Sequence, residues 1–223
     1  MTPANILLTL AVIISAYLIG SVSFAVVYSR IFLGKDIRSE GSGNAGATNM
    51  LRTGGAKLGV LTFVSDILKA MLAAFIGRLV FAYIFKTTPV DMFNPLFGGY
   101  LGCVFAMIGH VFPVFFNFKG GKAVSCSVGG LLLCCPIPLL IGLGVFGISV
   151  LTTKIVSLSS LVATATVFVL AVIMADTTLP VLPQIIFMFI AAAIIYIKHA
   201  DNIKRLIRGT EKEITIGKGK KNG

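Results

Sequence analysis

Long apolar stretches alternate with short polar segments along the whole chain of 223 residues. A transmembrane helix needs about 20 mainly apolar residues, and most of these stretches reach or approach that length. No polar segment is long enough to form a separate soluble domain. The pattern therefore predicts an all-α, polytopic integral membrane bundle that forms a single domain. The predicted spans are residues 4–33, 57–84, 94–110, 121–135, 137–151, 156–175 and 180–198.

The fourth and fifth stretches are short, so the number of spans is either seven or six. Only CCPIP separates them, and Pro136 and Pro138 mark either a tight turn or a kink within one span. With seven spans, every Lys and Arg lies on one side except Lys69 and Arg78, inside the second span, and Lys86, on the far side. Because cytoplasmic loops are enriched in Lys and Arg, charge favours seven transmembrane helices, with the N-terminus outside and the C-terminus cytoplasmic.

Composition agrees with a membrane protein and changes how the charge is interpreted. Hydrophobic residues make up 57% of the chain, against roughly 45–50% in soluble proteins even when glycine is counted. The net charge of +11 would suggest nucleic-acid binding in a soluble protein, but here topology accounts for it and no nucleic-acid partner is expected. The basic tail at 212–223 adds a weak attraction to anionic membrane lipids. MTPANILL lacks the basic region of a signal peptide, so we expect the first span to be retained.

The cysteines and histidines give no indication of a metal site. All four cysteines lie in or beside apolar segments, and none has metal-ligand spacing with either of the two histidines. A buried cysteine usually behaves as a small hydrophobic residue. We therefore expect no metal and no other cofactor. The cysteines are Cys103, Cys126, Cys134 and Cys135.

Two opposite charges lie inside the second predicted span. Asp66 and Lys69 are three residues apart, so a helix places them on one face. Charged side chains inside a bilayer are costly unless they are paired. The spacing predicts an ion pair with a structural role rather than a catalytic one.

The stretch GSGNAGATN, residues 41–49, places small polar residues directly after the first predicted span. Its glycines allow positive φ and leave backbone N–H groups free to line an anion-binding concavity. Arg52 adds a guanidinium suited to phosphate, and the second span, beginning near Lys57, presents a helix N-terminus to the same place. The pattern is neither Walker A nor GxGxxG, so it predicts an anion site without indicating a nucleotide. The expected residues are Gly41, Ser42, Gly43, Asn44, Gly46, Thr48, Asn49 and Arg52.

Three more polar clusters lie at the ends of predicted spans on the same side of the membrane. GHVFPVFFNFKGGKAV places two glycines between lysines before the fourth span, and TTKIVSLSS covers the start of the sixth. KHADNIKRLIRGTE follows the seventh span. His110 ends an apolar helix, where a histidine is more often a capping or core residue than a catalyst. The candidates from these clusters are Lys119, Gly120, Gly121, Lys122, Ser157, Ser160, His199, Asn202 and Arg205.

Together the four clusters indicate the chemistry of the substrate. Each supplies donors that bind phosphate, and all lie at one edge of the bilayer, so we expect a substrate that is anionic at one end and apolar at the other. A transporter for an anionic solute would need charges near the membrane midplane and two related halves, and the sequence contains no internal repeat. A non-catalytic lipid-binding protein would not need two separate glycine-rich basic loops.

GSGNAGATNMLR, GHVFPVFFNFKGGK and H-x-x-N-I-K-R-L-x-x-G-T-E closely resemble blocks of the bacterial acyl-phosphate:glycerol-3-phosphate acyltransferases, the PlsY family. The resemblance runs essentially from end to end. It implies a seven-helix enzyme of the bacterial inner or plasma membrane, with its active site on the cytoplasmic face and no cofactor. The implied reaction transfers a fatty acyl group from acyl phosphate to the 1-hydroxyl of glycerol 3-phosphate, giving lysophosphatidic acid and phosphate for phospholipid synthesis. A monomer is expected.

The resemblance also assigns roles to individual residues. Ser42 and Arg52 match the family's essential serine and arginine, and His199 and Asn202 match its histidine and asparagine near glycerol 3-phosphate. These four are the expected catalytic residues, and the other candidates of the four clusters are expected to bind substrate. Glu211 matches a glutamate with a structural role.

The chain departs from the family pattern at a few positions, and the general base stays open. Ala123 replaces a glycine, Cys126 a threonine and Lys154 a common arginine, and Ala70 stands where a glycine is usual. These changes concern helix packing rather than the reaction. The HxxxxD dyad of acyl-CoA-dependent acyltransferases is absent. Either His199 or, in the interpretation that we favour, a phosphate oxygen of the substrate takes the proton.

Overall fold

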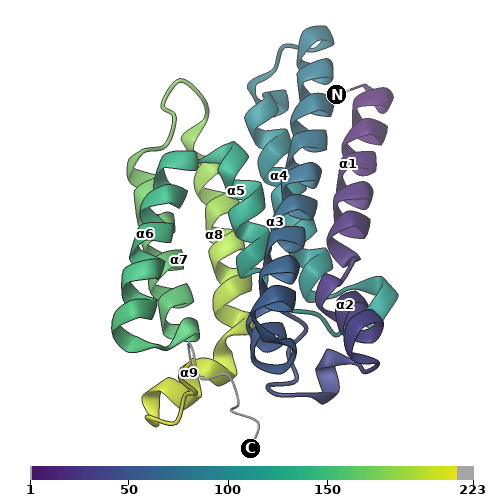
Figure 1. The fold of residues 1–223 in the computed structure, drawn as a ribbon. Helices are drawn as coiled ribbons and strands as arrows, with labels where there is room; N and C mark the ends of the chain where they lie inside the picture. Colours follow the sequence, from purple (N-terminus) through teal and green to yellow (C-terminus); the bar gives the residue numbers. More distant parts are fainter. Residues whose placement is uncertain (1, 215–223) are drawn as a thin grey trace, which may run out of the picture.

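The computed structural model describes residues 2–214, which are mostly helical and contain no β-strand (Figure 1). Most of the predicted basic tail, residues 215–223, lies outside the described residues. The α-helices are α1 (Pro3–Ser21), α2 (Phe24–Leu33), α3 (Ala47–Thr87), α4 (Pro95–Val111), α5 (Val124–Cys134), α6 (Pro136–Thr153), α7 (Val156–Ile173), α8 (Val181–Lys198) and α9 (Ala200–Ile207), with short 3₁₀ turns at Ile37–Ser39, Asp91–Phe93 and Val114–Phe116.

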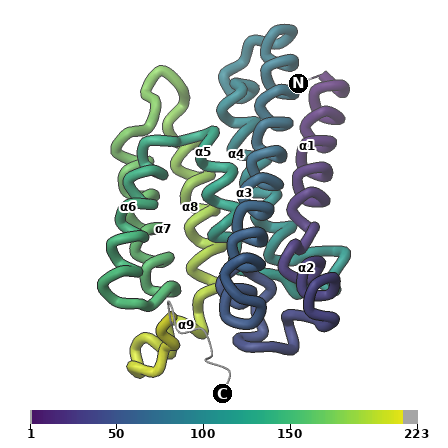
Figure 2. Tube along the Cα trace, in the orientation of Figure 1, coloured from purple at the N-terminus to yellow at the C-terminus, as the bar shows by residue number. Residues whose placement is uncertain are grey.

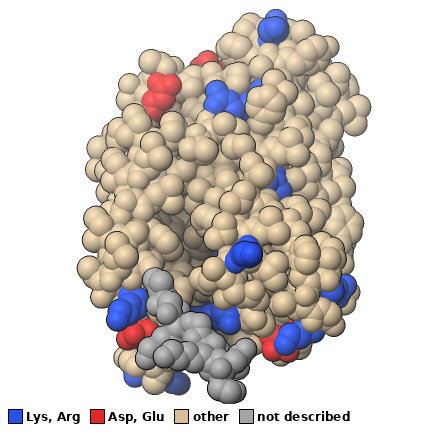
Figure 3. Space-filling model, in the orientation of Figure 1, with Lys and Arg blue, Asp and Glu red and all other residues tan. Residues whose placement is uncertain are grey.

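The long helices form two groups that α5 and α8 join. α1, α3 and α4 pack against one another on one side, and α6 pairs with α7 on the other (Figures 1 and 2). Helix α9 lies at the same end of the molecule as α2 and the start of α3 (Figure 2). On the face drawn in Figure 3, Lys and Arg side chains are most frequent at this end, and a few others are scattered over the rest.

Helix α4 forms the centre of the first group because small residues let its neighbours approach closely. A Cβ atom at Gly102 would collide with the carbonyl oxygen of Ala73 in α3, and one at Gly109 with that of Tyr17 in α1. In a membrane, where helix association depends on close packing, such contacts are a main source of stability. These contacts therefore fix the distances between the backbones of α1, α3 and α4.

The seven predicted spans correspond to six long apolar helical segments and the shorter helix α5. The predicted span 121–135 contains only 11 helical residues, Val124–Cys134, or about 16 Å at 1.5 Å per residue. The helix ends at Cys134, because its C-cap Cys135 leaves helical geometry and Pro136 begins α6. This length is about half of a bilayer's hydrocarbon core. Within the described residues, hydropathy correctly located the helices, but it overestimated the length of this one.

The first predicted span, 4–33, is interrupted in the structure. Val22 and Ser23 have extended backbone conformations that separate α1 from α2. An interruption at membrane depth leaves carbonyl oxygens without helical partners, and these need another donor. The Lys69 ammonium donates to the Val22 carbonyl oxygen at 2.5 Å. A buried lysine from α3 therefore compensates for the break.

Helix α3 consists of two helical segments that meet at Gly55, two residues before the predicted start of the second span near Lys57. α3 begins at Ala47, with Gly46 as its N-cap, so the last third of GSGNAGATN is already helical. Gly55 leaves helical geometry, with φ of +82° and ψ of 177°, and the longer segment follows it, close to the predicted start of the span. A Cβ atom at Gly59 would collide with Leu51, so the short first segment lies against the start of the longer one.

Candidate active site

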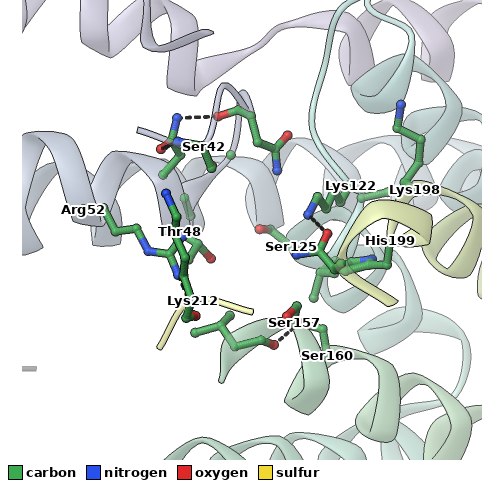
Figure 4. A pocket seen from close by; sticks show the side chains of 18 of the residues that line it. Ser42, Thr48, Arg52, Lys122, Ser125, Ser157, Ser160, Lys198, His199 and Lys212 are labelled. Atoms are coloured by element: carbon green, nitrogen blue, oxygen red, sulfur yellow. Dashed lines mark hydrogen bonds between the residues drawn. The ribbon is translucent and has the colours of Figure 1, made fainter. Parts of the chain in front are cut away.

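A pocket of about 450 Å³ lies where the four polar clusters meet. In Figure 4, Ser42, Thr48 and Arg52 lie on one side of it, with Lys122, His199, Ser157 and Ser160 around the rest. Segments far apart in the sequence therefore share one cavity. The predicted site residues that line it are Gly41, Ser42, Asn44, Gly46, Thr48, Asn49, Arg52, Lys122, Ser157, Ser160, His199, Asn202 and Arg205, together with Glu211.

The side chain of Asn49 fixes the conformation of the glycine-rich loop through hydrogen bonds to its backbone. Its side-chain oxygen accepts the Ser42 backbone N–H at 2.9 Å, and its amide donates to the carbonyl oxygens of Ile37, Glu40 and Asn44. An amide group has only two hydrogens, so these contacts leave none for a ligand. The Asn49 amide therefore organises the loop, and the predicted contact of Asn49 with substrate stays a prediction.

The first turn of α3 presents backbone N–H groups and a cation to the same pocket. The N-cap is Gly46, and no side chain caps the helix, so its N-terminal partial positive charge faces the cavity. Arg52 lies one turn further along. It donates through Nη2 to the carbonyl oxygen of Lys212 at 3.2 Å, which fixes one edge of its guanidinium.

The GGK segment contributes one lysine to the pocket and not the other. Lys122 lines the cavity and donates to the side-chain oxygen of Asn202. Lys119 is exposed and does not line it, because Asn117 and Phe118 have positive φ and turn the chain before the glycines. The prediction that Lys119 binds substrate therefore lacks support from the geometry.

Backbone contacts of the glycines in GGK fix this segment against α4. The N–H of Gly121 donates to the carbonyl oxygen of His110 at 3.0 Å, and a Cβ atom at Gly120 would collide with that same oxygen. Gly120 and Gly121 form the base under Lys122 without lining the pocket themselves, and neither does Gly43 in the first loop. The structure thus places these three glycines beside the pocket, and their predicted contacts with substrate stay predictions.

Glu211 is the centre of the wall formed by α7 and α9. Its carboxylate accepts from Ser157 at 2.8 Å, Asn202 at 2.5 Å and Arg205 at 2.6 Å. Burial opposes ionisation of the carboxyl, but the hydrogen bonds from Arg205, Ser157 and Asn202 outweigh it and lower the Glu211 pKa. One carboxylate thereby orients three of the predicted site residues, which agrees with the structural role expected of Glu211.

His199 is neutral and exposes a hydrogen-bond acceptor to the pocket. It follows α8 directly, and its Nδ1 lies 2.8 Å from the carbonyl oxygen of Ile195. A carbonyl oxygen only accepts, so Nδ1 carries the hydrogen and Nε2 is free to accept. Burial lowers the pKa of His199 to about 4. This histidine is suited to receive a hydrogen bond from a hydroxyl group at neutral pH.

An apolar groove continues from the polar pocket into the bundle. The two cavities share Phe63, Val124, Phe146 and Ser160, and the groove then runs inward between α5, α6, α7 and α8. Leu131, Leu139, Val167 and Met188, all buried, lie at its deeper end. The site can therefore accommodate a molecule with a charged head and a hydrocarbon chain.

The sequence profile of the glycerol-3-phosphate acyltransferase family matches residues 10–209 of the chain. The chain belongs to this family. Relatives include glycerol-3-phosphate acyltransferase 2 of Bacillus anthracis, 41% identical over 91% of this chain and 97% of its own, and glycerol-3-phosphate acyltransferase of Bacillus subtilis, 41% identical over 91% and 95%. The protein is thus an acyltransferase.

Solved structures extend the similarity of this acyltransferase to the whole fold. The crystal structure of PlsY (YgiH), an integral membrane glycerol 3-phosphate acyltransferase, in its glycerol 3-phosphate form is 32% identical. It covers 93% of this chain and 96% of its own, with a TM-score of 0.79. Its lysophosphatidic acid form gives a TM-score of 0.76. Together with the six long apolar segments, this likeness identifies a multi-pass membrane protein.

Some residues that line the acyltransferase pocket were not candidates from the sequence. Ser125, Lys198 and Lys212 each lie within three residues of a candidate, so the motifs indicated their neighbourhood without singling them out. His110 was interpreted as a capping or core residue, yet it also lines the pocket. Only the packing of α4 against the GGK segment reveals its position.

Lys122 is expected to give the acyltransferase an alkaline limb in its pH profile. Burial lowers the pKa of Lys122 to about 8; Glu211 acts in the opposite direction, and Arg205 and Arg52 add to the lowering. Lys122 carries its positive charge below this pH and loses it above, so kcat/KM for glycerol 3-phosphate should fall as pH rises through about 8. In Lys122→Arg the cation persists and the limb should disappear, as measured by steady-state pH profiles.

Lys119→Arg is the matched control for this experiment, because it makes the same substitution in the same segment outside the pocket. Its alkaline limb should stay where the unmodified enzyme has it. An unchanged limb in Lys122→Arg would show that another group is responsible.

Proposed function

We propose that this acyltransferase takes its acyl group from acyl phosphate and transfers it to the 1-hydroxyl of glycerol 3-phosphate, producing lysophosphatidic acid and phosphate. One observation carries the proposal: a pocket with cations on several walls opens directly into an apolar groove. Both substrates bear a phosphate, and the donor adds a hydrocarbon chain. The name of the related crystal structure in its glycerol 3-phosphate form supports the acceptor.

The proposed reaction needs positioning and charge neutralisation more than a strong nucleophile. Acyl phosphate is a mixed anhydride, so its phosphate is already a good leaving group. The hydroxyl oxygen attacks the acyl carbon, the bond from that carbon to the phosphate oxygen breaks, and the hydroxyl proton passes to a phosphate oxygen of the substrate. Arg52 and Lys122 hold the anionic heads together, which lowers the barrier by proximity and electrostatics.

Other residues are proposed to orient the acceptor. The free Nε2 of His199 accepts a hydrogen bond from a hydroxyl of glycerol 3-phosphate. Arg205 and Asn202, which Glu211 holds in place, bind polar groups of the acceptor. Ser42 lies on the opposite wall, where its hydroxyl and backbone are available to the donor phosphate. The role of His199 as a general base is the alternative, and its pKa of about 4 makes it a weak base.

The proposed topology has seven crossings, with the N-terminus outside, the C-terminus cytoplasmic and the active site on the cytoplasmic face of the bacterial plasma membrane. Charge supports this orientation, because the basic side chains gather at the end that holds the pocket (Figure 3). Helix α5 is short, yet non-helical backbone is tolerated at membrane depth when protein surrounds it. Gly129 and Gly130 of α5 are buried against α3 and α4, so neighbouring helices cover the backbone of this short crossing.

The deciding experiment compares acyl phosphate, acyl-CoA and acyl carrier protein side by side as donors to glycerol 3-phosphate in detergent. Turnover with acyl phosphate alone, without added metal or nucleotide, is the expected result. Comparable rates with acyl-CoA as the only donor would overturn the proposed donor. Turnover in detergent also separates the enzyme from a transporter, which needs two compartments.

The apolar groove makes a prediction of its own. Ala192 of α8 lines the groove, so Ala192→Phe should fill part of it. Overpacking of this kind costs about 1–3 kcal/mol, and kcat/KM with a palmitoyl donor should fall on the order of ten-fold, with a smaller loss for an octanoyl donor. Ile186→Phe, an exposed position on the same helix outside the groove, is the control. Equal losses with both chain lengths would place the acyl chain elsewhere.

A further inference from the structure

Behind the pocket lies a buried cluster of ionisable side chains that the proposed reaction does not use. Asp66 and Lys69 of α3 form the predicted ion pair at 2.7 Å, and both are buried. The Lys69 ammonium also lies 3.1 Å from Nδ1 of His110 and donates to the carbonyl oxygen of Val22. The ammonium therefore contacts three groups, through an ion pair with Asp66 and hydrogen bonds to the other two.

This cluster contains residue types that bind metal ions, but the ammonium of Lys69 already provides a cation there. Asp66, His110 and Cys126 place ligand atoms within 4.8 Å of one another. The ammonium of Lys69 contacts two of these residues, Asp66 and His110, and would repel a metal ion held between them. Asp66 and Lys69 together are neutral, which suits burial inside a membrane bundle.

The contact with Lys69 determines which nitrogen of His110 carries the hydrogen. An ammonium has no lone pair, so Nδ1 must accept, and the hydrogen of the neutral ring lies on Nε2. Asp66 Oδ1 is 3.5 Å from the same Nδ1 and would favour a hydrogen there, but it is farther away and already holds the ammonium. A charged ring would add a second cation to a buried pair that is neutral without it.

The Nε2 edge of His110 faces the pocket across Gly121. Only 4% of the surface of His110 is exposed, and this residue lines the cavity. A Cβ atom at Gly121 would collide with Nε2 and lie 2.9 Å from the carbonyl oxygen of Ala45. The hydrogen bonds of His110 within the described residues involve its Nδ1, and none involves Nε2. Because Gly121 has no side chain, this donor stays open toward the cavity.

We propose that His110 is a substrate-binding residue, which donates its Nε2–H to a phosphate oxygen held above the GGK segment. Asp66 and Lys69 are positioning residues that hold the ring and its tautomer. This inference rests on the proposed placement of the substrate phosphate in the pocket. A neutral donor at this position binds an anion without adding a buried charge, unlike the cations Lys122 and Arg52.

The two histidines make the tautomers directly measurable. Protein labelled with ¹⁵N-histidine has two imidazole rings, and His110→Gln assigns them by removing one. In detergent at neutral pH, His110 should be the Nε2–H tautomer and His199 the Nδ1–H tautomer. Saturating glycerol 3-phosphate should shift the Nε2 resonance of His110. A His110 ring that is charged, that carries its hydrogen on Nδ1, or that does not respond to glycerol 3-phosphate would overturn the proposal.

Kinetics separate binding from a purely structural role. His110→Phe keeps the ring volume without a donor and should raise KM for glycerol 3-phosphate on the order of ten-fold or more. It also removes an acceptor of the Lys69 ammonium, so its melting temperature must show that the comparison concerns folded protein. His110→Gln restores an N–H near Nε2 and should recover part of this loss. Unchanged KM in His110→Phe would overturn the role, and so would equal KM in the two variants.

The positioning role of the ion pair needs a neutral replacement. Asp66→Asn combined with Lys69→Met leaves no unpaired charge in the bundle, and in this double variant His110 should become a mixture of tautomers. A pure Nε2–H tautomer there would remove the positioning role. The NMR measurements do not involve an acyl donor, so a failed donor assignment and a failed role for His110 would be told apart.

Discussion

Replacing Arg52 with lysine is expected to lower kcat/KM on the order of a hundred-fold even though the positive charge is kept. The guanidinium of Arg52 has one edge fixed by the Lys212 carbonyl oxygen, which turns its remaining N–H groups toward the pocket. A planar fork binds two phosphate oxygens at once, whereas an ammonium binds as a point charge. Removing one preorganised donor from such a site typically lowers kcat about 10²–10³-fold.

The control for Arg52 is another arginine at the same end of the molecule. Arg30 pairs with Asp36 at 2.9 Å, is largely exposed and does not line the pocket. Exposed ion pairs contribute little, so Arg30→Lys should change kcat/KM by less than about two-fold. Steady-state kinetics with both substrates varied would measure the difference. Similar activities of the two lysine variants would show that Arg52 contributes only charge.

Replacing His199 has the second large effect and tests what the ring does. If Nε2 orients glycerol 3-phosphate, His199→Gln keeps an acceptor and should lose roughly ten-fold, mainly through a higher KM, whereas His199→Ala should lose on the order of a hundred-fold. The low pKa, about 4, keeps the ring neutral across the working range. An acid limb near pH 6 would therefore reflect the substrate phosphate, whose second pKa is about 6, and should persist in His199→Gln.

The opposite result would identify His199 as the general base. In that case His199→Gln would be nearly inactive at saturating substrate, and the acid limb would disappear with the ring. Melting temperatures of both variants in detergent would show that the comparison concerns folded protein. The two mechanisms thus differ in kcat and in the pH profile, not only in overall activity.

The sequence located the helices and the four polar clusters because both depend on local properties. Hydrophobic length defines α6, α7 and α8 almost to the residue, and the basic residues placed all the clusters at one end. Local pattern could not distinguish Lys119 from Lys122, since both flank the same glycines. The left-handed turn at Asn117 and Phe118 decides between them.

Contacts between distant segments account for the other differences. The ion pair of Asp66 and Lys69 followed from helical spacing, but its contact with His110, 41 residues beyond Lys69, depends on how α3 packs against α4. The donation from Lys69 to Val22 across the break between α1 and α2 has the same origin. Sequence indicated which residues carry chemistry, and packing determined which of their atoms stay free.

The close backbone contacts around α4 have a consequence for how this enzyme tolerates mutation. At Gly102 and Gly109 even a methyl group would collide with a neighbouring backbone, whereas Gly144 and Gly147 of α6 have open space around them. Random substitutions should therefore be eliminated at the first two positions and accumulate freely at the other two. Substitutions in α6 and α7 can therefore change the shape of the groove. The close contacts of α4 keep the walls of the phosphate-binding pocket in fixed positions.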